Sequence, residues 1–162
     1  MEKTMQIHLP EAIAQKLIKA LKQAGSKETG GILMGEYLSP EVYRIAELTI
    51  QVQRGTLASF LRLPHLVLRP LQKFFQRTGN QFTHFNYLGE WHSHPLYSIE
   101  PSSVDCDSMW EIVSDHSVGA NFAVLMVVRL NTIGQLEGSV TIFLPNRRLF
   151  SGELVQKPPG EK

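Results

Sequence analysis

The segment from Gly89 to Asp105 constrains the fold of this chain more than any other part of the sequence. His92 and His94 are two residues apart, so in an extended strand their side chains lie on the same face. Pro95 follows them and cannot donate to a sheet ladder, so we expect the strand to end there. After a loop, Ser102 has the pattern of a helix start. The two imidazoles can therefore converge on one ion from the end of a strand.

Asp105 lies about one turn into the helix and can supply a carboxylate oxygen as a third ligand. Two histidines and one carboxylate leave a fourth zinc position for water, which is typical of catalytic rather than structural zinc sites. Zinc lowers the pKa of such a water toward about 7, so a nucleophile is present at neutral pH. We therefore predict one zinc ion per chain, bound by His92, His94 and Asp105.

Ser102, three residues before Asp105 on the same helical face, allows two interpretations. Its hydroxyl could hydrogen-bond the attacking water or a developing oxyanion. Alternatively, Ser102-Ser-Val-Asp105 is a capping box, in which the serine caps the helix and the aspartate reaches back. Taken alone this pattern favours the cap, and a His-x-His pair alone is a weak indication of metal ligands. Their occurrence together, with prolines bracketing the loop, favours a hydrolytic site.

A hydrolase also needs a general base, and the residues alone leave four candidates: Glu28, Glu36, Glu90 and Glu100. Glu90 shares a strand face with the two histidines, whereas Glu28 precedes the apolar run Gly30–Gly35. Spacing does not choose between them.

Other potential metal ligands have weaker patterns. Asp107 could replace Asp105 but lies off the face of Ser102, and Cys106 is expected to be a small core residue. Four further histidines have no partner at ligand spacing and are expected on the surface or in the core: His8, His65, His84 and His116.

Composition excludes several classes of protein. A chain of 162 residues with 43% hydrophobic and 19% charged residues is typical of one soluble globular domain. The net charge of +1 predicts binding neither to nucleic acid nor to an anionic membrane. The single cysteine rules out an internal disulfide, and the polar N-terminus contains no signal-peptide pattern. We therefore expect a cytoplasmic protein.

Periodicity and turn residues predict an α/β protein with a mixed sheet. One domain is expected over residues 1–155, followed by a flexible tail at 156–162. Helices are expected from Pro10 to about Gly25, from Pro70 to about Gly79 and from Ser102 to about Ser114. Strands are expected at 30–35, 42–53, 82–91, Phe122–Leu130 and Leu136–Leu144, with Phe150 and Leu154 extending the sheet and an irregular segment at 54–64.

These residues resemble the JAMM (JAB1/MPN/Mov34) metalloprotease family, whose motif is a glutamate, then His-x-His-Pro, then Ser-x-x-Asp. The match consists of Glu28, His92-Ser-His94-Pro95, the six-residue spacer Leu96–Pro101 and Ser102-Ser-Val-Asp105, and the likeness extends from about Pro10 to Leu144. A motif with this many fixed positions is specific.

The resemblance implies a fold and a set of roles. The fold would be the MPN/JAB fold, an α/β (α+β) arrangement in which helices flank a curved mixed β-sheet, as in cytidine deaminases. Glu28 would be the general base, and His92, His94 and Asp105 would be the zinc ligands. Ser102 would assist the tetrahedral intermediate.

The family's activity implies a zinc-dependent isopeptidase or peptidase that cleaves after the C-terminal residue of a ubiquitin-like protein attached to a target. The Gly-Glu-Trp-His context is similar to that of short bacterial members. Those often act beside E1- and E2-like enzymes, including the deconjugating peptidase of CBASS antiphage operons. Two alternatives stay open: a non-catalytic MPN scaffold, and a protease that processes a ubiquitin-like or sulfur-carrier precursor.

One departure concerns specificity. Some eukaryotic members carry an extra zinc-binding insertion of cysteines and histidines that helps to select the ubiquitin linkage. Here Cys106 is the only cysteine and the segment from Asp115 to Phe122 is short, so this insertion is expected to be absent. Linkage-specific cleavage of ubiquitin is therefore in doubt.

Overall fold

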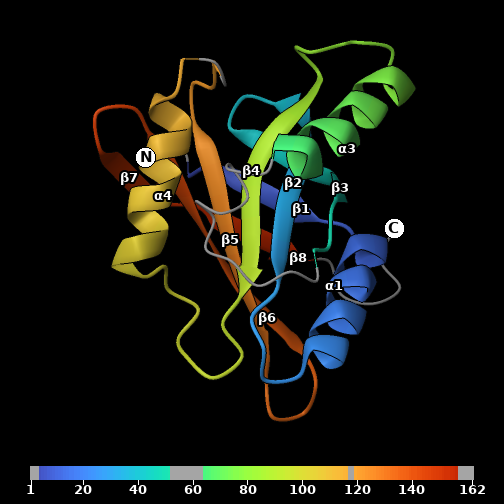
Figure 1. Ribbon diagram of the computed structural model, residues 1–162, viewed down its shortest axis with the longest axis vertical. Helices are drawn as coiled ribbons and strands as arrows, with labels where there is room; N and C mark the ends of the chain where they lie inside the picture. Colours follow the sequence, from blue (N-terminus) through green and yellow to red (C-terminus); the bar gives the residue numbers. More distant parts are fainter. Residues whose placement is uncertain (1–3, 52–63, 117–118, 157–162) are drawn as a thin grey trace.

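A mixed eight-stranded sheet, in the order β7-β6-β5-β4-β2-β3-β1-β8, forms the centre of the molecule (Figure 1). The computed structural model describes residues 4–51, 64–116 and 119–156, and residues 64–68 by their backbone alone. The helices are α1 (Glu11–Ala24), α3 (Pro64–Arg77) and α4 (Ser103–Ser114). The strands are β1 (Gln6–Leu9), β2 (Gly30–Ser39), β3 (Val42–Leu48), β4 (Phe85–Ser93), β5 (Ala123–Leu130), β6 (Leu136–Leu144), β7 (Arg148–Ser151) and β8 (Glu153–Gln156).

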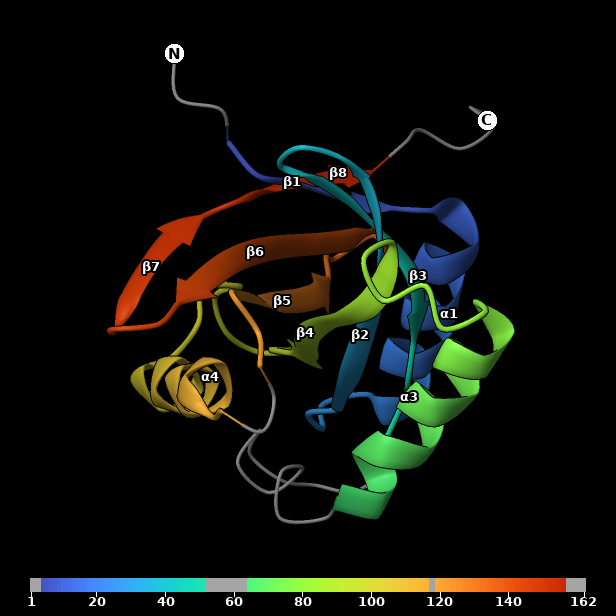
Figure 2. The ribbon, with the colours of Figure 1, turned by 90° about the horizontal axis from the view of Figure 1, so that it is seen from above.

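The sheet curves until its two edges are joined by a single stretch of chain (Figure 2). β7 pairs antiparallel with β6, and β8, which follows directly, pairs in parallel with β1. Between them, the Gly152 N–H donates to the Val140 carbonyl at 3.0 Å and the Glu153 N–H donates to the Met5 carbonyl at 2.9 Å. The last two strands therefore connect opposite edges of the sheet, which is nearly closed. Phe150 and Leu154 lie in them, as the sequence predicts.

The inner face of the curved sheet packs against α1. This helix begins after Pro10, ends at Gly25 and turns its apolar stripe inward, as its sequence periodicity predicts. Its buried side chains join those of β1, β2, β3, β5 and β6 in one large core cluster. The outer face is covered by α4 over β5 and by α3 over β2. Among the described residues, no helix combines the length and apolar character needed to cross a membrane.

Helix α3 begins at Pro64, so the prediction of a start at Pro70 is wrong. Pro64 suits a first helical position, where the missing N–H costs no hydrogen bond. Pro70 lies inside the helix, where one intrahelical bond is lost. Phe74, which is 2% exposed, packs against β2 and helps to hold the helix in place despite that loss. The predicted irregular segment 54–64 lies outside the described residues except for Pro64 itself.

Strand β3 is shorter than predicted and changes face within its length. Residue Gly35 pairs with Ile45 while Met34 pairs with Glu47, so Ala46 is the extra residue of a bulge. Ile45 therefore faces the inner core, while Ala46 packs on the outer face. Regular alternation along the strand would place Ala46 on the same face as Leu48, but the single bulge shifts the side-chain period and puts them on opposite faces.

Strand β4 is the central strand that leads to the predicted site. It begins at Phe85, three residues later than predicted, and ends at Ser93, just before Pro95. It pairs antiparallel with β2 and in parallel with β5, its register with β2 shifting at a bulge around Leu88. A parallel pair requires a crossover, and the crossover here contains α4. This connection brings the start of α4 to the end of β4.

Candidate metal centre

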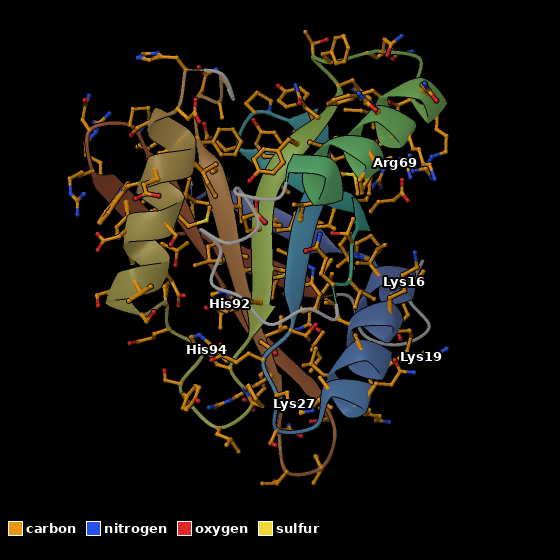
Figure 3. The ribbon with its side chains drawn as sticks, in the orientation of Figure 1. Lys16, Lys19, Lys27, Arg69, His92 and His94 are labelled. Atoms are coloured by element: carbon orange, nitrogen blue, oxygen red, sulfur yellow. The ribbon has the colours of Figure 1, made fainter. Side chains whose placement is uncertain are left out.

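The two histidines of the sequence motif lie at the end of β4, at the lower edge of the sheet in Figure 3. His92 is the penultimate residue of the strand, and His94 follows its last residue. The His94 N–H still donates to the Val128 carbonyl of β5 at 3.0 Å. This hydrogen bond extends the strand pairing by one residue and holds both imidazoles at the sheet edge.

His92, His94 and Asp105 form a compact cluster of three potential ligand atoms. The Nε2 atoms of the two histidines are 3.0 Å apart. Asp105 Oδ2 lies 3.2 Å from Nε2 of His92 and 3.4 Å from Nε2 of His94. The three side chains are 9–16% exposed, so the cluster is mostly shielded but reachable from solvent.

This donor set fits a zinc ion. Zinc bound tetrahedrally at about 2.1 Å has ligand atoms about 3.4 Å from one another. The three edges of the triangle, 3.0, 3.2 and 3.4 Å, are close to that length. Two imidazole nitrogens and one carboxylate oxygen are also the ligand types of catalytic zinc sites. The residues present could therefore hold such an ion without large rearrangement.

A backbone carbonyl orients one of the histidines. Nδ1 of His94 lies 2.8 Å from the carbonyl oxygen of Ser98, which can only accept, so Nδ1 carries the proton. In the neutral ring the lone pair is then on Nε2, which faces Asp105. This pairing is the usual outer contact of a metal-binding histidine.

Asp105 belongs both to the predicted metal cluster and to the capping box of α4. Its carboxylate accepts from the Ser102 N–H at 2.8 Å, and its own N–H donates to Ser102 Oγ at 3.1 Å, which is the predicted capping box. Burial raises the pKa of Asp105. This effect is outweighed by the hydrogen bond and charge of His92 and by the hydrogen bonds to Ser102, so the pKa falls to about 2. The carboxylate is therefore ionised at neutral pH and suited to a cation.

Ser102 is exposed beside the cluster. Its oxygen accepts the capping hydrogen bond from the Asp105 N–H, and its side chain also interacts with the Asp105 carboxylate, which helps to lower the pKa of Asp105. The cap is therefore the interaction that the structure contains, and a role of Ser102 toward substrate stays a prediction.

Glu28 lies on the loop between α1 and β2, and its side chain is exposed. Its neighbour Thr29 is tied to Ser93, the residue between the two histidines. The Ser93 N–H donates to the Thr29 carbonyl at 2.9 Å, and the Thr29 N–H donates to Ser93 Oγ at 3.0 Å. Lys27, labelled in Figure 3, marks this loop at the same edge of the sheet. The pairing brings the backbone of Glu28 close to the histidines.

Glu90, another candidate base, is buried within the sheet, with 2% of its surface exposed. Its Oε1 accepts a hydrogen bond of 2.6 Å from the Tyr87 hydroxyl. Burial raises the pKa of Glu90 to about 8, although the hydrogen bond from Tyr87 lowers it in part. The side chain is therefore mostly protonated at neutral pH. It is also shielded from solvent, whereas Glu28 is exposed.

The remaining candidates lie elsewhere. Asp107 pairs with Arg147 at 2.8 Å, and Glu36 binds Arg44 at 2.6 Å on the far half of β2. Glu100 is exposed on the loop before α4. Cys106 is a free, partly buried thiol beside the core under α4. Among the described histidines outside the motif, none joins a cluster that could hold a metal: His8, His84 and His116.

The groups that support the site could not be found from patterns in the sequence. Ser98 acts through its backbone, and Ser93 reaches Thr29 across 64 positions of sequence. Arg129 and Ser139 donate to the loop between β4 and α4 from 32 and 40 positions away. No spacing pattern joins such residues, because their contact depends on the register of the sheet.

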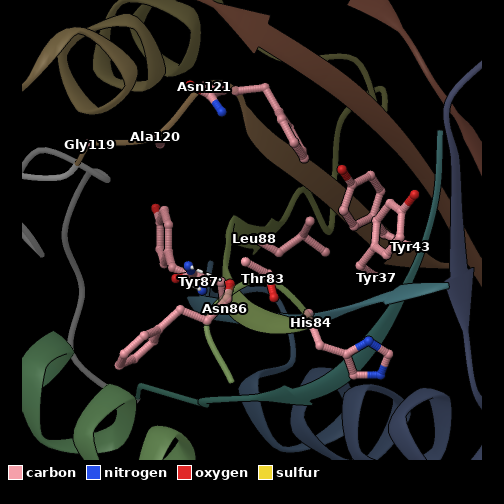
Figure 4. Close-up of a pocket in the computed structure, with 13 residues that line it drawn as sticks. Tyr37, Tyr43, Thr83, His84, Asn86, Tyr87, Leu88, Gly119, Ala120 and Asn121 are labelled. Carbon is pink, nitrogen blue, oxygen red and sulfur yellow. Dashed lines mark hydrogen bonds between the residues drawn. The ribbon is translucent and has the colours of Figure 1, made fainter. Parts of the chain in front are cut away.

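A cavity of about 220 Å³ opens at the opposite end of β4 (Figure 4). Tyr37 and Tyr43 lie on one side of it and Tyr87 on the other, with Leu88 between them (Figure 4). It contains none of the predicted site residues. The cavity and the histidine cluster are therefore separate features of the molecule.

Comparison with known proteins identifies the family of this chain. Residues 10–138 match Prok-JAB, described as prokaryotic homologs of the JAB domain. The CD-NTase/cGAS isopeptidase of Enterobacter hormaechei subsp. hoffmannii (strain UCI 50) is 30% identical over 139 residues, which are 84% of this chain and 74% of that protein.

Solved structures agree with this match at the level of the fold. The solution structure of a protein from Desulfitobacterium hafniense superposes with a TM-score of 0.63 at 15% identity, covering 93% of this chain and 92% of the other. A protein from Salinibacter ruber gives a TM-score of 0.52 at 15% identity, with coverages of 96% and 94%. The predicted fold, a curved mixed sheet flanked by helices, is confirmed, and the chain belongs to the prokaryotic homologues of the JAB domain.

Proposed function

We propose that this protein is a zinc-dependent isopeptidase that removes a ubiquitin-like protein from its target by cleaving after the C-terminal residue. The JAB family and the isopeptidase-named relative support a deconjugating peptidase in general. The zinc-dependent mechanism is supported by the triangle of His92, His94 and Asp105, because the distances between their ligand atoms match those around one tetrahedral ion.

The chain's own residues supply the remaining chemistry. A zinc ion held by the cluster would activate a water molecule and polarise the scissile carbonyl. Glu28 accepts one proton from the attacking water and delivers it to the amine nitrogen as the C–N bond breaks. The products are a carboxylic acid and an amine, which become a carboxylate and a protonated amine when the carboxyl proton is transferred. Ser102 donates its hydroxyl hydrogen to the negative charge that develops on the carbonyl oxygen. Glu28 suits this role better than Glu90 because it is exposed and near the cluster.

The relative's name supplies the substrate to test first. It describes an isopeptidase of CD-NTase/cGAS, so a CD-NTase that carries a ubiquitin-like protein through an isopeptide bond is the matching substrate. Such a conjugate requires E1- and E2-like enzymes to form, and genes for them beside this one would support a place in antiphage defence.

The first experiment measures zinc content and cleavage in one set of variants. The purified protein should hold about one equivalent of zinc. Glu28→Gln should keep that zinc and lose at least about 100-fold of the cleavage rate, in line with a missing general base. Glu111→Gln, an exposed glutamate on α4, is the matched control and should keep both properties. The readouts are metal analysis and release of the ubiquitin-like protein from the conjugated CD-NTase.

Several results would overturn the proposal or one of its parts. Zinc well below one equivalent, unrestored by added zinc, would contradict the metal site. Inactivity of Glu90→Gln together with an active Glu28→Gln would show that the base is assigned wrongly. Cleavage of a linear precursor with residues after its terminal glycine, without cleavage of the conjugate, would replace deconjugation by precursor processing.

A further inference from the structure

The loop between β4 and α4 is held by its backbone carbonyls. Three consecutive carbonyls each accept a hydrogen bond from a side chain: two of these side chains come from strands of the sheet, and the third is His94, which directly follows β4. Tyr97 accepts from Arg129 of β5 at 2.8 Å, Ser98 lies 2.8 Å from Nδ1 of His94, and Ile99 accepts from Ser139 of β6. The middle carbonyl of the three is the one that orients a ligand of the predicted metal site.

Arg129 has a fixed position from which to hold the loop. Its Nε donates to Glu137 Oε2 at 2.9 Å, and Glu137 is its register partner on β6. The guanidinium is planar and rigid, so the bond to Glu137 also sets the direction of the NH1 donor toward Tyr97. The side chains of Arg129 and Glu137 are 36% and 38% exposed, so this pair adds little stability by itself.

Ser139 holds the other side of the loop. Its position lies two residues from Glu137 along β6, so both side chains share the face that the loop crosses. The Ile99 side chain packs beside the core under α4, which fixes the same peptide unit from its apolar side. The carbonyls on both sides of Ser98 are therefore anchored to the sheet.

The other contacts of the loop are local. The Tyr97 N–H donates to the His94 carbonyl at 3.4 Å, the Tyr97 ring lies edge-on to the His94 ring, and the Glu100 N–H donates to Ser98 Oγ at 3.2 Å. Side chains of Leu96 and Tyr97 are 72% and 55% exposed, and Ser98 and Glu100 are also exposed. Without anchors, such a loop would sample many backbone conformations, each of which moves the Ser98 carbonyl. The carbonyl would then leave Nδ1 of His94, and the ring would lose the contact that fixes its tautomer.

We propose that Arg129 and Ser139 are positioning residues for the metal ligand His94. They hold the loop so that the Ser98 carbonyl fixes the proton of His94 on Nδ1 and leaves Nε2 ready to bind the ion. This inference rests on the proposed zinc site and adds to it two residues that never touch the ion. Loss of outer partners of metal ligands commonly weakens metal affinity by about 10- to 100-fold.

Zinc affinity tests the proposal without reference to catalysis. Competition with a chromophoric chelator should show Arg129→Gln and Ser139→Ala each binding zinc more weakly, and the double variant at least about tenfold more weakly than the unaltered protein. Arg44→Gln is the control, because Arg44 is also an exposed arginine paired with a glutamate on a neighbouring strand but, within the described part of the chain, donates to no loop. Its zinc affinity should stay within about twofold.

The His94 tautomer separates a positioning role from a general loss of stability. Nitrogen NMR of the imidazole rings in metal-free protein should show the Nδ1–H tautomer of His94 in the unaltered chain and a mixture in the double variant, at a temperature where both are folded. An unchanged tautomer and unchanged zinc affinity in the double variant would overturn the proposal. If the unaltered protein binds no zinc, the proposed function fails, while the tautomer still decides whether these residues position His94.

Discussion

Two carboxylates near the end of β4 have opposite protonation states for physical reasons. Asp105 is partly exposed and surrounded by donors, and its pKa of about 2 keeps it ionised. Glu90 is buried and its Oε1 accepts a hydrogen bond from Tyr87, but among the described residues its Oε2 has no hydrogen-bond partner. Its pKa of about 8 keeps it mostly protonated at pH 7. Similar side chains, fifteen positions apart, are thus suited to different tasks: cation binding for Asp105 and packing for Glu90.

Glu90 should make the stability of the protein fall as the pH rises. The pKa of Glu90 in the folded protein, about 8, lies above the ordinary 4.5. The contribution of Glu90 to the unfolding free energy is therefore complete below pH 4.5 and is lost as the pH rises through 8. Between these values the loss approaches about 1.4 kcal/mol per pH unit. Urea unfolding with a chelator present should show Glu90→Gln gaining stability relative to the unaltered protein from about pH 5 to pH 8. Parallel pH profiles would contradict the burial of an uncharged Glu90.

At the scale of elements, β4 and the loop after it explain which parts of the site could be predicted. His92, His94 and Asp105 lie within fourteen residues, so strand and helix periodicity suffice to bring them together. Glu28 could be named only by family resemblance, because its distance from the histidines depends on the pairing of β2 with β4. The contacts of Arg129 depend likewise on sheet register. Local patterns carry no information on register beyond the strand itself.

The bulges in the strands were also not predicted. The bulge of β4 is followed by Gly89, which packs tightly against β5. Its φ is +157°, and a Cβ at this position would lie 1.8 Å from the Val124 carbonyl oxygen of β5. Gly89→Ala should therefore separate β4 from β5 and destabilise the fold by more than about 3 kcal/mol. Gly134→Ala is the control, since its φ is also positive but no atom of the described residues lies within 4 Å of a Cβ placed there. It should cost only about 1 kcal/mol in thermal or urea unfolding. Equal losses would mean that φ, and not the contact with β5, determines the effect.

For the whole molecule, the order of strands is what the sequence could not supply. Most strands and all three described helices were expected near their observed positions, yet the order β7-β6-β5-β4-β2-β3-β1-β8 joins segments far apart in the chain. In particular, β8 pairs with β1, at opposite ends of the described chain. Periodicity predicts that a segment is a strand but does not name its partner, because many pairings bury the same faces.

The pairing of β8 with β1 nearly closes the sheet, and we expect the fold to depend on it. Residues Glu153–Gln156 pair along the whole of β1, and Leu154 packs against the inner core. A chain ending at Gly152 would expose the edge of β1 and part of that core, and it should lose at least about 2 kcal/mol of unfolding free energy. A chain ending at Gln156 keeps every described residue and should match the full chain in urea unfolding. If both truncated chains unfold like the full protein, β8 merely lies against β1, and the curvature of the sheet must come from its bulges and inner core alone.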